Sequence, residues 1–191
     1  MWAADQCFAR GYIQGKPTRT LNVDEYHILD CKLALSGWQR VDELNRQAKD
    51  SKKAFIAMKF GSAELDLMLR AHWIPAVAKT GFRLQRLDDE PKAGLIDDRL
   101  RTEIRTSRFL LADLTHSNPG AYWEAGYAEG LGRPVIYLCR QDVFDDVSTR
   151  PHFDTNHHLT VRWDPAQPEA SCVELKSIIR VTLPTEAQLE D

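Results

Sequence analysis

Glu124 is the residue whose type and position point most directly to chemistry. It lies in the stretch from Leu111 to Cys139, LADLTHSNPGAYWEAGYAEGLGRPVIYLC, where the pattern predicts a strand ending at Asp113 and a helix over 121–131. Glu124 then falls in the first helical turn, where free backbone N–H groups and the helix dipole favour an ionised carboxylate. Such a carboxylate suits a nucleophile or an electrostatic stabiliser, although a first-turn Glu is also common in helices without any catalytic role.

Other candidate side chains follow predicted strands. Asp88 comes after a strand over 82–87 and is the best candidate for a second catalytic carboxylate; the alternative is a solvated acidic loop. Asp113 either faces the same crevice as Glu124 or caps the next loop by a hydrogen bond to its backbone. His116 in that loop could donate a proton, because His titrates near neutrality, or have no role.

Short apolar runs alternate with amphipathic segments, and these elements must position the candidates. Strands are expected over 54–58, 82–87, 109–112, 135–139 and 159–163, and helices over 63–79, 95–106, 121–131 and 172–180. Pro75 should kink or shorten the first of these helices. The alternation predicts an α/β fold, a three-layer flavodoxin-like or Rossmann-like sandwich with a mostly parallel sheet of about five strands. Ligands of such folds bind beyond the carboxyl ends of the strands.

The first 52 residues differ from the rest of the chain. They are polar, are interrupted by Gly and Pro, and hold only a short expected strand over 31–35, a helix over 36–47 and a charged linker. We therefore expect a small N-terminal extension over 1–52, too small to hold a core alone, and a main domain over 53–191.

Several features around Glu124 form one combined pattern. They are Asp113, Asn118, the pair Tyr122-Trp123, the run EAGYA at 124–128 and the run GRPVI at 132–136. The combination resembles the nucleoside 2-deoxyribosyltransferase-like superfamily, which includes nucleotide N-glycosidases and is related in fold to TIR-type NAD-cleaving domains. The resemblance extends over residues 53–165, and the upstream run AFIAMKFG looks like the first strand and substrate loop of that group.

The resemblance implies that Glu124 attacks the anomeric carbon of a nucleoside, a nucleotide or an NAD-like substrate, or stabilises the oxocarbenium-like transition state. Met58, Phe60 and Gly61 would bind substrate, Phe60 by stacking on the base and Gly61 by permitting close backbone approach. The chain departs from the deoxyribosyltransferases at Asn118, where they carry an aspartate. An amide cannot act there as acid or base, so Asn118 is expected to hydrogen-bond a sugar hydroxyl instead.

Two further expectations concern the helix that carries Glu124. Trp123 and Tyr127 share one helix face and either form the wall of a substrate pocket or fill the core. Gly126 is unusual in mid-helix, and a close contact with a ligand or with other backbone would explain it.

Two functions remain open at this point. The first is an N-glycosidase or glycosyl transferase that needs no metal and no cofactor. The second is a non-catalytic module that senses a nucleotide or associates with itself, as part of a larger bacterial system, including a defence system. A homodimer is expected in either case, because the family often completes its pocket across subunits.

Composition excludes several other classes. Lys and Arg number 25 against 28 Asp and Glu, a net charge of −3, which argues against binding nucleic acid through backbone charge. No apolar run approaches the roughly 20 residues of a membrane span, and the first residues show no basic segment followed by an apolar one. The four widely spaced cysteines form no CxxC pair, so free thiols in the cytoplasm are expected.

Overall fold

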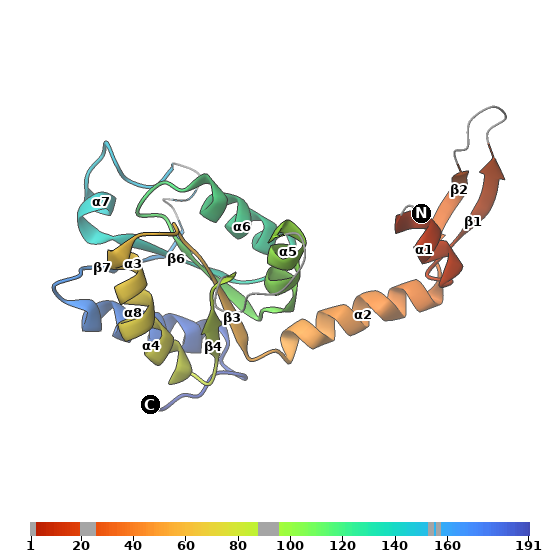
Figure 1. The fold of residues 1–191 in the computed structure, drawn as a ribbon. Helices are drawn as coiled ribbons and strands as arrows, with labels where there is room; N and C mark the ends of the chain where they lie inside the picture. Colours follow the sequence, from red (N-terminus) through yellow and green to blue (C-terminus); the bar gives the residue numbers. More distant parts are fainter. Residues whose placement is uncertain (1–2, 20–25, 88–95, 153–154, 156–157) are drawn as a thin grey trace. The chain divides into compact units, whose positions relative to one another are not determined.

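The computed structural model describes residues 3–19, 26–87, 96–152, 155 and 158–191 (Figure 1). The chain divides into two compact units, Met1–Asp50 and Ser51–Asp191. Among the described residues, no helix combines the length and the apolar character that crossing a membrane requires.

The smaller unit is built from a hairpin and two helices. Helix α1 (Ala3–Ala9) precedes the antiparallel strands β1 (Ile13–Arg19) and β2 (Tyr26–Leu33), and helix α2 (Leu35–Lys49) follows. The predicted strand over 31–35 is wrong at its end, because Leu35 already belongs to α2. Strand β1 was not predicted because Gly15 and Pro17 interrupt its pattern; it is held by pairing with β2, with a register shift between Gln14 and Lys16.

The larger unit is built on a five-stranded sheet whose neighbouring strands are all parallel. The strands are β3 (Lys53–Ala57), β4 (Arg83–Gln85), β5 (Phe109–Asp113), β6 (Val135–Arg140) and β7 (Thr160–Trp163), in the order β4-β3-β5-β6-β7. The order is that of a doubly wound, flavodoxin-like sheet. Every residue of β5 is buried, as expected for a parallel strand covered on both faces. The predicted α/β three-layer fold is confirmed.

One face of the sheet is covered by the helical stretch α3 (Ala63–Leu67), η1 (Met68–Trp73) and α4 (Ile74–Ala78), together with α8 (Pro168–Thr182) (Figure 1). In this core the rings of Trp73 and Trp163 meet edge to face, with centroids 5.7 Å apart. Of the two expected effects of Pro75, shortening is not observed, because the helical stretch continues to Ala78. The turn before Pro75 is π-helical, with the Ile74 N–H bonded to the Leu69 carbonyl, and this wider turn accommodates the proline ring.

The other face is covered by α5 (Ile96–Thr106) and α6 (Pro119–Gly130). Their buried side chains include Ile104 and the three alanines Ala121, Ala125 and Ala128. Because alanine is small, α6 lies close on the sheet. A short helix that the sequence did not predict, α7 (Gln141–Asp145), follows β6.

Candidate functional site

The place where the strand order reverses lies between β3 and β5. The helix that follows β3 covers one face of the sheet, and the helix that follows β5 covers the other. The two connecting loops therefore diverge beyond the carboxyl ends of these strands, which is where doubly wound folds bind ligands. Met58, Phe60 and Gly61 lie in or beside the first loop, and His116 and Asn118 lie in the second.

Glu124 lies in the second turn of α6, and the prediction that it lies in the first turn is wrong. The helix begins earlier, because Asn118 caps it and Pro119 takes its first position. The Asn118 Oδ1 accepts a hydrogen bond from the Gly120 N–H at 3.2 Å. Asn118, which was expected to hydrogen-bond a sugar hydroxyl, therefore caps the helix through its amide oxygen.

The Glu124 carboxylate points back along α6 toward the start of the helix. A methyl group placed on Gly120 would lie 3.8 Å from Glu124 Oε1 and 3.4 Å from Asn118 Oδ1, so both side chains lie near Gly120. Within the part of the chain that the structure describes, the partly buried carboxylate has no hydrogen-bond or ion-pair partner. Burial raises the pKa of Glu124 from 4.5 to about 7. The expectation of an ionised form favoured by the helix dipole is wrong for this reason.

Asp113 is 1% exposed and its oxygens are bonded within the protein. They accept hydrogen bonds from the Thr115 N–H at 3.2 Å, the Thr115 hydroxyl at 3.0 Å and the Trp163 indole N–H at 3.0 Å. Burial nevertheless raises the pKa of Asp113 to about 6. Of the two interpretations from the sequence, the structure shows the loop-capping one. The link to Trp163, which joins the ends of β5 and β7, was not foreseen.

Phe60 stands at the surface of the first loop with 52% of its area exposed. The neighbouring Gly61 has φ +73°, a conformation that favours glycine, and open space lies where its Cβ would be. Met58, by contrast, is 3% exposed and belongs to the core. Arg86 was not among the predicted site residues, yet its guanidinium lies 5.6 Å from the centroid of the Phe60 ring. The only available signal was its place just after the carboxyl end of β4.

His116 is exposed in the second loop. Partial burial lowers its pKa, and the positive charges of Lys59 and Arg140 lower it further, while Glu64 acts in the opposite direction. A neutral imidazole at pH 7 is the consequence, and it is a poor proton donor. Lys59 belongs to the first loop, so a charge of that loop acts on the His116 imidazole.

Trp123 lies on the surface of α6, with 48% of its area exposed. Its ring stacks on Tyr127 with centroids 5.3 Å apart and planes 7° apart. Arg101 and Arg105 of α5 lie over the two rings at 5.7 and 5.8 Å. Tyr127 is partly buried and packs against the core between α6 and the sheet, as expected for one of the two aromatic residues, whereas Trp123 lies outside that core.

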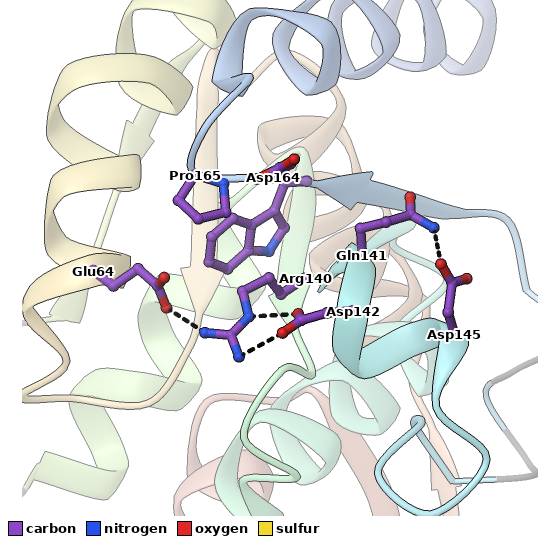
Figure 2. Close-up of a pocket in the computed structure, with 8 residues that line it drawn as sticks. Glu64, Arg140, Gln141, Asp142, Asp145, Asp164 and Pro165 are labelled. Carbon is purple, nitrogen blue, oxygen red and sulfur yellow. Dashed lines mark hydrogen bonds and ion pairs between the residues drawn. The ribbon is translucent and has the colours of Figure 1, made fainter.

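A cleft of about 560 Å³ opens beyond the carboxyl ends of β6 and β7, and none of the predicted site residues lines it (Figure 2). Arg140 lies at its centre, bonded to both oxygens of Asp142 at 2.6 and 3.0 Å and to Glu64 at 2.8 Å. Trp163 and Asp164, at the end of β7, also line the cleft. Because the donors of Arg140 bond to these two carboxylates, the guanidinium fixes the start of α3 against α7.

Asp88, the expected second catalytic carboxylate, lies outside the described residues. Among the residues that the structure describes, no three His, Cys, Asp or Glu side chains gather closely enough to hold a metal ion.

No protein-family model matches the chain, and the comparison with curated proteins finds no match either.

Proposed function

We propose that the protein cleaves or transfers the N-glycosidic bond of a nucleoside, a nucleotide or an NAD-like substrate, with Glu124 as the nucleophile or oxocarbenium stabiliser. The observation that carries the proposal is the state of the Glu124 carboxylate. It is partly buried, has no partner within the described residues and has a pKa raised to about 7. A carboxylate held in this way destabilises the fold and is more readily explained by reactivity than by structure.

The chemistry requires Glu124 in its ionised form. In the nucleophilic route, a carboxylate oxygen bonds to the anomeric carbon while the bond from that carbon to the base nitrogen breaks. The base nitrogen keeps the bonding electrons. A purine or pyrimidine then takes a proton from water, whereas the pyridinium nitrogen of an NAD-like substrate leaves as the neutral base and takes no proton. Water then hydrolyses the ester, which releases the sugar and restores the carboxylate. Because the pKa is about 7, the reactive fraction of Glu124 rises as the pH passes through neutrality.

The loop after β3 supports a substrate that carries a planar base. Phe60 presents an exposed ring beyond the carboxyl end of β3, and the space above Gly61 is open. Aromatic rings of this kind bind nucleobases by stacking, with little preference for the identity of the base. The position therefore suits a nucleoside or a nucleotide, without defining which one.

Base release is the experiment that tests this function. The purified full chain is incubated with nucleosides, nucleoside monophosphates and NAD, and free base is followed by chromatography. We expect release by the wild type and its loss in Glu124→Gln. Glu129→Gln is the matched control, because Glu129 is an exposed carboxylate on the same helix, and it should retain activity. Absence of release from every compound, with a folded protein, would overturn the proposal.

A second candidate is a module that binds a nucleotide without turning it over. This alternative is supported by the state of Asp113, the other predicted catalytic carboxylate within the described residues. Its oxygens already accept hydrogen bonds from Thr115 and Trp163, which is a structural role. On this alternative, a nucleotide binds the wild type and Glu124→Gln equally, and no base is released. The expected homodimer stays a prediction under both functions.

A further inference from the structure

The ring of Phe60 packs against the guanidinium of a buried arginine, Arg86. Arg86 is 7% exposed, and its guanidinium lies over the Phe60 ring at 5.6 Å from the centroid. A buried guanidinium is costly unless it is paired. Asp66 of α3 supplies that pairing through an ion pair with Arg86 Nη1. Three segments, the loop after β3, the end of β4 and helix α3, therefore meet at this arginine.

The arrangement leaves Phe60 accessible at the surface. The guanidinium occupies one side of the ring, while about half of the residue remains exposed (52%). The next residue, Gly61, adopts φ +73° and has no atom within 4 Å of the position of a Cβ. An exposed aromatic ring on a loop normally loses conformational freedom when a ligand binds. The contact with Arg86 limits that loss in advance, because the guanidinium is fixed by its own ion pair.

We propose that Arg86, anchored by Asp66, is a positioning residue that holds Phe60 as a stacking platform for the base of the substrate. Arg86 does not touch the substrate and acts through the Phe60 ring. The inference rests on the proposed function for the identity of the substrate. It does not depend on turnover, because a platform of this kind acts on binding.

Binding to the Glu124→Gln full chain tests the platform separately from the chemistry. Equilibrium dialysis with adenosine, AMP and NAD gives a Kd for each compound that binds. We expect Phe60→Leu to weaken binding on the order of tenfold, since stacking of a base on an aromatic ring contributes about 1–3 kcal/mol. Phe60→Trp should restore most of the affinity, because it restores a planar ring.

Arg86→Met keeps the apolar stem and removes the guanidinium. We expect it to weaken binding about threefold, which corresponds to a cation–π contact of about 0.5–1 kcal/mol. In the Phe60→Leu background the same substitution should have no further effect, because Arg86 acts only through the ring. Arg108→Met is the matched control: Arg108 is another largely buried arginine paired with one carboxylate, Glu186, but it lies at the opposite end of the sheet.

The outcomes separate the two proposals. Equal losses for Arg86→Met in both backgrounds would assign it a merely structural role and overturn the inference. Failure of all three compounds to bind, or binding that Phe60→Leu leaves unchanged, would also overturn it. Binding that depends on Phe60 and Arg86 without base release in the wild type would refute the proposed function and leave the platform intact. If the wild type releases base, we expect Phe60→Leu and Arg86→Met, made in the otherwise wild-type chain, to raise KM with little change in kcat.

Discussion

Replacing Glu124 by Gln should stabilise the protein while it abolishes base release. Burial raises the pKa of this carboxyl from 4.5 to about 7, so the folded state prefers the protonated form. The stability that Glu124 contributes is fully present below its unfolded pKa. It is lost as the pH rises through the folded pKa. The free energy of unfolding of the wild type should therefore fall progressively, through this group, from about pH 4.5 to about pH 7.

The size of this penalty follows from the shift. One pKa unit corresponds to about 1.4 kcal/mol, so at about pH 8 the ionised Glu124 lowers the free energy of unfolding by about 3 kcal/mol. Gln cannot ionise and escapes the penalty. At about pH 5 the difference between the two proteins should shrink to less than about 1 kcal/mol, because Glu124 is then mostly protonated in the folded state.

Urea unfolding of both proteins at these two pH values measures the effect. Asp113 titrates in an overlapping range, but it is present in both proteins and cancels from the comparison. Glu129→Gln is the control and should show no such gain. Base release by Glu124→Gln should fall on the order of 100-fold or more. If the difference in free energy of unfolding between Glu124→Gln and the wild type were the same at both pH values, the reasoning would be refuted. Ionisation of Glu124 would then carry no burial penalty.

The kcat/KM for base release should rise with pH with an apparent pKa near 7, because the ionised Glu124 is required; a profile that falls over this range would assign it an acid role. Trp163→Phe should lower the free energy of unfolding by about 1–3 kcal/mol in urea melts at neutral pH, since the buried Asp113 loses a donor. Gly61→Ala should lower it by about 1 kcal/mol because φ is +73°. Gly126→Ala should raise it by about 1 kcal/mol in the same assay, because the added Cβ meets nothing within 4 Å; destabilisation there would indicate a contact that these chain segments do not make.

The alternating strands and helices of the larger unit were predictable because their sequence signals, apolar periodicity and turn residues, are local. Strand β5, FLLAD, is an apolar run that ends in Asp113, and it lies within a residue of its predicted bounds. The start of α6 was misplaced although the sequence holds its signal, since Asn118 followed by Pro119 is a cap followed by a first helical residue. A helix that begins at Pro119 places Glu124 in its second turn. Strand β1, with Gly15 and Pro17, gave no such signal and depends on its partner strand.

The sequence by itself determined the α/β alternation and the parallel sheet, because apolar periodicity and turn residues act over a few neighbouring positions. Only the tertiary structure decided the states of the side chains. The pKa of Glu124 depends on what surrounds it, the bond from Trp163 to Asp113 spans fifty positions of the chain, and Arg86 reaches Phe60 from another strand. Burial and pairing of charges are set by groups that meet only when the chain has folded, so no local pattern encodes them.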